Sequence, residues 1–219
     1  MNYLISWKDL LYSEKKKKYF LNIISYINEE RKNKIIYPSN KNIFKVFALT
    51  PIASIKIVIV GQDPYYSNNK AHGLAFSVKK NIFIPLSLRN IFIEIKNDLG
   101  DFDIPNHGCL HQWAKQGVFL LNRILTVEEN KPGSHANIGW KNFTNKIIDI
   151  INIHLTGVIF LLWGNFANEV VKNINTRKHY ILQASHPSPL SAYKGFFGCR
   201  HFSKSNSILL SEGKKPIVW

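Results

Sequence analysis

The apolar stretch Ile55-Lys56-Ile57-Val58-Ile59-Val60, followed by Gly61, is the starting point for predicting the fold. It is rich in β-branched residues and is interrupted only by Lys56, which is typical of a strand buried within a sheet. Three shorter apolar runs come later, and polar residues or glycine follow each of them directly. They are Val118 to Leu121, Val158 to Leu162, and Tyr180 to Leu182 with its continuation.

Segments with helical periodicity alternate with these strands. They are Leu86 to Asp98, Trp140 to His154, Phe166 to Ile174 and Ser203 to Leu210, with an amphipathic helix at Tyr19 to Asn33 before the first strand. The alternation predicts an α/β fold with a central four-stranded, mostly parallel sheet flanked by helices on both faces. A length of 219 residues, without repeats or a linker, predicts a single domain over residues 1–219.

The charge balance favours a polyanionic partner. The chain has 29 basic and 14 acidic residues, a net charge of +15, so nucleic acid is the first candidate. Compositional drift toward Lys, Ile and Asn is the alternative explanation. The run Lys15 to Lys18 is an ambiguous signal because such runs are usually solvated faces, and we favour that interpretation.

The two cysteines, Cys109 and Cys199, are far apart and form no CxxC pair. They fit neither a disulfide framework nor a four-thiolate cluster, and a reducing cytoplasm suits them best. No apolar run approaches the roughly 18 residues that a membrane span needs, and no secretion signal is evident at the N-terminus. We therefore expect a cytoplasmic protein that does not contact membranes.

The candidate site lies in the loops that follow the predicted strands, because open α/β sheets bind ligands outside the carboxyl ends of their strands. These loops bring one carboxylate, one imidazole, one amide and several hydroxyls toward one edge of the sheet. They comprise Gly61-Gln62-Asp63-Pro64-Tyr65-Tyr66, Asn122, Trp163-Gly164-Asn165, and Ser185-His186-Pro187-Ser188-Pro189-Leu190-Ser191.

Asp63 and His186 together suit a hydrolytic site, in which a carboxylate orients water and an imidazole meets developing negative charge. Taken singly, an Asp after a strand is often only a helix cap or a turn residue. The neighbouring prolines Pro64 and Pro187 restrict the backbone beside both side chains, which suits a preorganised site.

The other candidates are less specific. Ser87, Ser188 and Ser191 could donate to phosphates, but turn formation or helix capping explains each one equally well. Similarly, Tyr65 and Phe76 could enclose a base, although such aromatic residues are more often part of a core.

His107 and His111 have the spacing of two zinc ligands on a helix, but Pro105 and Gly108 make a regular helix doubtful. We expect no metal there. Neither a P-loop nor a GxGxxG fingerprint occurs, which weakens any nucleotide-cofactor interpretation.

Two of these loops carry a family resemblance. Gly61-Gln62-Asp63-Pro64-Tyr65 and His186-Pro187-Ser188-Pro189-Leu190-Ser191 resemble the two signature motifs of the principal, uracil-specific family of uracil-DNA glycosylases. The similarity extends over nearly the whole chain, in the family's order. It also includes Ala71-His72-Gly73-Leu74-Ala75-Phe76-Ser77, Pro105-Asn106-His107-Gly108, Leu120-Leu121-Asn122, Leu161-Leu162-Trp163-Gly164 and Gly195-Phe196-Phe197-Gly198-Cys199.

The resemblance implies base flipping and hydrolysis of the N-glycosidic bond by a monomer that needs no metal or cofactor, acting on uracil-containing DNA, single- or double-stranded. It also assigns roles. Asp63 would orient water and neutral His186 would donate to uracil O2, while Asn122 would read the base edge, Phe76 would stack on it and Tyr65 would exclude thymine. Backbone donors near Gln62 would hold the base, Leu190 would enter the vacated stack, and Ser87, Ser188 and Ser191 would contact phosphates.

Three positions depart from the family pattern: Tyr66 stands where His is usual, Leu86 where a second proline is expected, and Arg123 where a small polar residue is common. Each of three rival functions conflicts with a feature of the sequence. A broader mismatch glycosylase conflicts with Tyr65, if that residue walls the pocket. A basic module that only binds nucleic acid conflicts with the central acidic Asp63. An α/β ester hydrolase lacks its G-x-S-x-G motif.

Overall fold

The computed structural model describes residues 6–219 and places a four-stranded sheet at their centre. Its strands are β2 (Ile57–Gly61), β3 (Val118–Asn122), β5 (Ile159–Trp163) and β6 (Tyr180–Ala184). Their order is β3-β2-β5-β6, and each neighbouring pair is parallel. The predicted α/β fold with a central parallel sheet is confirmed.

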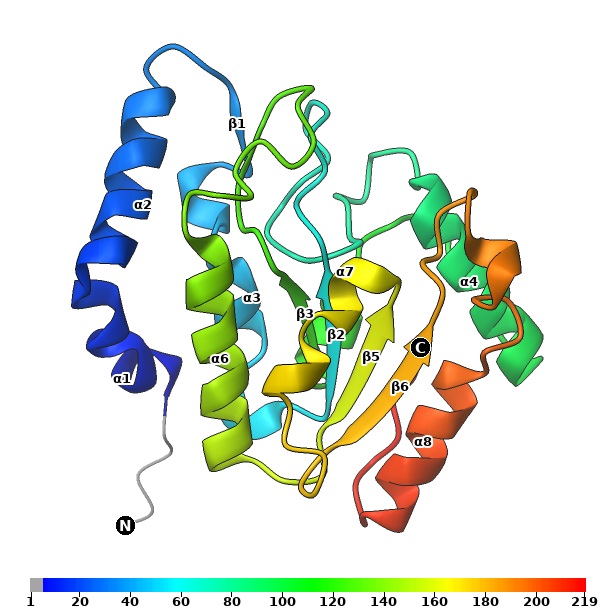
Figure 1. The fold of residues 1–219 in the computed structure, drawn as a ribbon. Helices are drawn as coiled ribbons and strands as arrows, with labels where there is room; N and C mark the ends of the chain where they lie inside the picture. The colour runs from blue at the N-terminus through cyan, green and yellow to red at the C-terminus, as the bar shows by residue number, and fades with distance from the viewer. Residues whose placement is uncertain (1–5) are drawn as a thin grey trace.

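Helices cover both faces of the sheet, as expected: α2 and α6 lie on one side and α4 and α8 on the other (Figure 1). The helices are α1 (Trp7–Tyr12), α2 (Lys18–Glu30), α3 (Lys45–Leu49), α4 (Leu86–Leu99), α5 (His111–Lys115), α6 (Trp140–His154), α7 (Asn165–Asn168) and α8 (His201–Ser211). A short antiparallel pair, β1 (Ile36–Tyr37) with β4 (Val127–Glu128), was not predicted because two residues show no periodicity.

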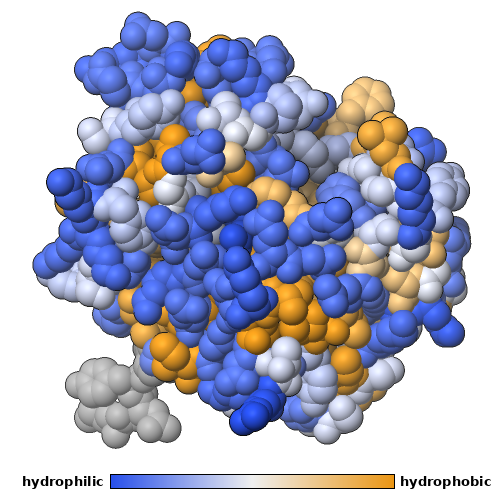
Figure 2. Space-filling view, in the orientation of Figure 1, coloured by the Kyte–Doolittle hydropathy of each residue, from blue (hydrophilic) through white to orange (hydrophobic). Residues whose placement is uncertain are grey.

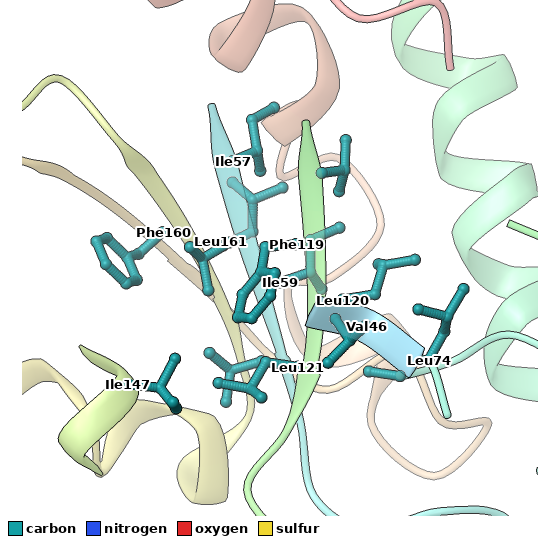
Figure 3. Close-up of a cluster of buried hydrophobic side chains, with 14 of the residues drawn as sticks. Val46, Ile57, Ile59, Leu74, Phe119, Leu120, Leu121, Ile147, Phe160 and Leu161 are labelled. Carbon is teal, nitrogen blue, oxygen red and sulfur yellow. The ribbon is translucent and has the colours of Figure 1, made fainter. Parts of the chain in front are cut away.

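The core forms on both faces of the sheet because every residue of β2, β3 and β5 is buried. Side chains from the strands, such as Ile59 and Phe119, pack with Val46 of α3 and Ile147 of α6 (Figure 3). Burial on two faces explains why these strands are continuous apolar runs rather than alternating ones. The edge strand β6 is only partly buried, and its sequence is correspondingly more mixed.

The predicted helix from Phe166 to Ile174 is wrong as a continuous element. The structure has α7, which ends at Asn168, and then a separate 3-10 turn over Val171–Asn173. The amide of Val170 bonds to the carbonyl three residues back, at Ala167, which tightens the backbone after α7. The β-branched pair Val170 and Val171 and the neighbouring Asn168 and Asn173 are all poor helix formers, which favours this break.

The face of the molecule shown in Figure 2 is largely hydrophilic, and its hydrophobic residues lie in separate patches. Among residues 6–219, no helix has the length and apolar character needed to cross a bilayer.

We predict that Ile59→Ala lowers the free energy of unfolding by about 2–5 kcal/mol, because it leaves a cavity in the central strand. Ile59 is 1% exposed, whereas Ile153 on α6 is 64% exposed. The matched variant Ile153→Ala should therefore stay within about 0.5 kcal/mol of the wild type. Urea denaturation measures both, and equal losses would contradict this description of the core.

Candidate active site

A cavity of about 200 Å³ opens at the carboxyl edge of the sheet. The loop after β2, the end of β3, the start of α4 and the loop after β6 all contribute to it. The structure thus brings together seven of the candidate residues, namely Gln62, Asp63, Tyr65, Phe76, Ser87, Asn122 and His186. The volume lies below the roughly 300–1,000 Å³ of drug-sized sites, so the cavity suits one small ring.

Asp63 follows β2 by two residues and is half-buried. Its Oδ2 accepts a hydrogen bond from the backbone N–H of Gly133 at 2.7 Å. Burial raises the pKa of Asp63, and the Gly133 N–H opposes that rise by stabilising the anion. One carboxylate oxygen is therefore anchored by the protein.

His186 follows β6 by two residues, and its Nδ1 accepts a hydrogen bond from the backbone N–H of Ser188 at 3.0 Å. Because Nδ1 is the acceptor, the proton of the neutral ring sits on Nε2. Burial lowers the pKa of His186, which favours this neutral form. Gly164 makes room for the residue, since a Cβ there would lie 2.8 Å from the His186 Cβ. The site thus holds a neutral imidazole whose Nε2–H is a donor.

Asn122 ends β3 opposite Gly61 and is 8% exposed. A Cβ on Gly61 would come within 2.3 Å of the Asn122 Oδ1, so only glycine leaves the amide in place. The backbone N–H of Arg123 donates to the Gly61 carbonyl at 3.0 Å and continues the pairing past the strand end. The amide is therefore held on a rigid part of the sheet.

Phe76 has a φ of 61°, a left-handed conformation that costs a bulky residue about 1–3 kcal/mol. The Tyr65 hydroxyl donates to the Phe76 carbonyl at 3.1 Å, and the Phe76 ring packs 5.6 Å from Trp163 and 5.9 Å from His186, centroid to centroid. Burial also raises the pKa of Tyr65, which keeps that hydroxyl protonated. The two aromatic side chains form adjoining walls of the cavity.

Three of the four DNA-contact candidates, namely Ser188, Leu190 and Ser191, lie outside the cavity lining. The hydroxyls of Ser188 and Ser191 share a hydrogen bond at 2.9 Å, and Ser191 Oγ also donates to the His186 carbonyl at 2.8 Å. Leu190 projects from the same loop with 88% of its surface exposed. Ser87, in the first turn of α4, is the one of these candidates that borders the cavity.

The three departures from the family pattern occupy different places. Tyr66 lines the cavity, and Leu86 starts α4 with 61% of its surface exposed. Arg123 is buried, and its guanidinium donates to Asn145 of α6 at 2.8 Å. It is absent from the cavity lining.

Two site features were missed from the sequence. Gly133 reaches Asp63 across 70 positions of the chain, and only its turn-forming context, Lys131-Pro132-Gly133-Ser134, marks the segment. Asn90 of α4 donates to the Pro187 carbonyl at 2.8 Å.

His107 precedes α5, which begins at His111, so these two histidines do not share a helix. Within residues 6–219, no group of three or more His, Cys, Asp and Glu residues could hold a metal ion.

Comparisons with known proteins agree on one family. Residues 47–210 match the model of the uracil DNA glycosylase superfamily. A uracil-DNA glycosylase of Buchnera aphidicola subsp. Acyrthosiphon pisum is 58% identical over 216 residues, which cover 99% of this chain and 98% of that relative. One from Photorhabdus laumondii is 51% identical, with 98% and 96% covered. The crystal structure of mimivirus uracil-DNA glycosylase superimposes with a TM-score of 0.93 at 33% identity and covers 97% of this chain and 85% of that one.

The fold and the site define an α/β protein with a small pocket, lined by both polar and aromatic side chains, at the carboxyl edge of a parallel sheet. The chain belongs to the uracil DNA glycosylase superfamily.

We predict that neutral His186 carries its proton on Nε2 and that the ring gains a second proton only below the ordinary imidazole pKa of about 6.5, because burial depresses its pKa and the Ser188 N–H occupies Nδ1. Nitrogen-15 NMR of labelled histidines measures both properties, with the His186 signals assigned from their loss in His186→Ala. Protonation of the ring near or above its ordinary pKa of about 6.5 would contradict the prediction. So would a proton on Nδ1.

Proposed function

We propose that this protein is a DNA-repair hydrolase that flips uracil out of DNA and hydrolyses its bond to deoxyribose, releasing free uracil and leaving an abasic site. One arrangement carries the proposal: a neutral His186 with a free Nε2–H, the Asp63 carboxylate and the Asn122 amide border one cavity of single-base size. The family membership supports the same reaction.

In the proposed reaction, the bond between the sugar C1′ and the base N1 breaks, and its electron pair leaves with uracil. The sugar gains positive character, which the Asp63 carboxylate stabilises, and water held by that carboxylate adds to C1′ and passes a proton to it. The uracil anion then takes up a proton from solvent and Asp63 releases its own, so the base and the sugar hydroxyl are both neutral products. The negative charge on the base spreads to O2, where His186 Nε2–H donates a hydrogen bond. A neutral donor suits this task because burial opposes a charged ring.

Base recognition in this proposal depends on Asn122. Its carbonyl accepts from uracil N3–H and its NH₂ donates to O4. Cytosine has an amino group at position 4 and no N3–H, so both contacts would be mismatched. Phe76 stacks on the ring, Tyr65 fills the space that the thymine methyl group needs, and backbone groups near Gln62 complete the contacts.

DNA binding is proposed to use the loop edges around the cavity. Ser87, Ser188 and Ser191 contact phosphates, and the exposed Leu190 enters the space that the flipped base vacates. The net charge of +15 supports attraction to DNA, single- or double-stranded. We further propose a cytoplasmic monomer that needs no metal or cofactor. The free thiols of Cys109 and Cys199 are compatible with that compartment.

The direct test is release of free uracil from an oligonucleotide with one U, with EDTA present and with matched T- and C-containing strands as controls. Release from the U strand alone is expected. Asp63→Asn should bind the same DNA but cleave it about 10²–10⁴-fold more slowly, the range typical of one acid–base group. Asp101→Asn, the same change at an exposed position, should match the wild type. An unimpaired Asp63→Asn enzyme would remove Asp63 from its role.

A second prediction concerns Tyr65. Tyr65→Ala should allow measurable release of thymine because it opens space beside the base, whereas Tyr65→Phe should act on uracil alone. The Phe variant keeps the ring but loses the hydrogen bond to the Phe76 carbonyl. Thymine release by the Phe variant, or none by the Ala variant, would show that the bulk of Tyr65 does not set specificity.

A further inference from the structure

One face of α4 carries three polar side chains at a spacing of four residues: Asn90, Glu94 and Asp98. Residues four apart lie above one another on a helix. Each of the three bonds to the chain between Pro187 and Ser203, which contains the proposed DNA-contact loop. A single helix face therefore holds this whole segment.

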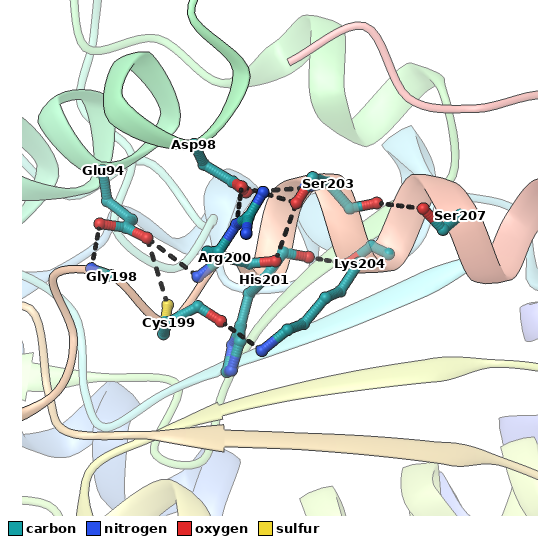
Figure 4. A network of polar contacts seen from close by, with 10 residues as sticks. Glu94, Asp98, Gly198, Cys199, Arg200, His201, Ser203, Lys204 and Ser207 are labelled. Atoms are coloured by element: carbon teal, nitrogen blue, oxygen red, sulfur yellow. Dashed lines mark hydrogen bonds and ion pairs between the residues drawn. The ribbon is translucent and has the colours of Figure 1, made fainter.

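Toward the C-terminal end of this face of α4, Glu94 and Asp98 make several hydrogen bonds (Figure 4). Glu94 is 1% exposed and accepts from the backbone N–H groups of Gly198 at 2.7 Å and Arg200 at 3.0 Å. Asp98 accepts from the backbone N–H of Ser203 at 2.8 Å and from its hydroxyl at 2.6 Å. These bonds satisfy N–H groups at the start of α8, so the return of the chain is fixed against α4.

At the N-terminal end of the same face of α4, Asn90 contacts the loop that carries His186. Asn90 Nδ2 donates to the Pro187 carbonyl at 2.8 Å, and the N–H of Ser188 donates to His186 Nδ1 at 3.0 Å. That carbonyl and that N–H belong to one peptide unit, which is planar. A rotation of this plane would weaken both hydrogen bonds together. A hydrogen bond accepted by the carbonyl also strengthens the N–H as a donor.

We propose that Asn90 is a positioning residue for His186: it fixes the Pro187–Ser188 peptide plane, whose N–H in turn holds the imidazole with its proton on Nε2. Glu94 and Asp98 hold the following part of the loop on the same helix, so α4 sets the loop relative to Ser87 and the cavity. The inference rests on the proposed role of His186 and extends it to a residue that is not part of the cavity lining.

The test compares Asn90→Ala with Asn97→Ala, the same change at an exposed position of α4. Asn90→Ala should lower the single-turnover rate of uracil release about tenfold, which corresponds to the loss of a hydrogen bond of about 1.4 kcal/mol. DNA affinity should change by less than about twofold, because Asn90 is proposed to act on His186 and not on the DNA contacts, and independent sites affect one another by no more than that. Asn97→Ala should change neither quantity.

Two further measurements separate positioning from a general structural effect. In a His186→Ala background, Asn90→Ala should cost less than about twofold in rate, because a residue that acts through His186 has nothing left to position. In nitrogen-15 NMR, Asn90→Ala should give a mixture of His186 tautomers. Asn90→Asp, which sets an oxygen against the Pro187 carbonyl, should lower the rate further.

Equal losses in the two backgrounds, or an Asn90→Ala protein with an unchanged His186 tautomer, would overturn the inference. Failure of the proposed function looks different, because the wild-type protein would then release no uracil. The NMR measurement needs no activity, so it decides the role of Asn90 in either case.

Discussion

The in-register parallel pairing of β2, β3, β5 and β6 determines where the strand-end loops of the site begin. It sets Gly61 opposite Asn122 and Trp163 opposite Ala184, so all four strands end at one edge. Asp63 and His186 each lie two residues beyond their strands. Their loops start from strands that are two positions apart, about 10 Å at ordinary strand spacing. That separation leaves room for one ring between a carboxylate and an imidazole.

Burial acts on both ionisable groups of the site and moves each toward its neutral form. It raises the pKa of Asp63 and lowers that of His186. Backbone N–H groups then decide how each side chain is used: Gly133 stabilises the Asp63 anion, while Ser188 fixes the lone pair of His186 on Nδ1. Rigid backbone donors therefore hold one carboxylate oxygen of Asp63 and fix the tautomer of His186, which is the kind of preorganisation on which electrostatic catalysis depends.

The sequence predicted those parts of the fold and site that depend on local pattern. Buried strands such as Ile57–Gly61 can be predicted because both of their faces need apolar residues. The site residues directly after the strands can be predicted because parallel strands end at the same edge of the sheet. Contacts between distant segments were not predictable. Three hydrogen bonds depend on how distant segments pack together. They join Asp63 to Gly133, Asn90 to Pro187 and Arg123 to Asn145 of α6. The break after α7 reflects weak helix propensity that a periodicity argument overlooks.

We propose that the strand ends build one pocket complementary to uracil, and a crystal structure of the protein with free uracil would show whether they do. We expect the base to stack on Phe76, with the Asn122 amide paired to N3–H and O4 and with His186 Nε2 within hydrogen-bond distance of O2. Uracil bound elsewhere, or bound in the cavity with its O2 turned away from His186, would contradict it.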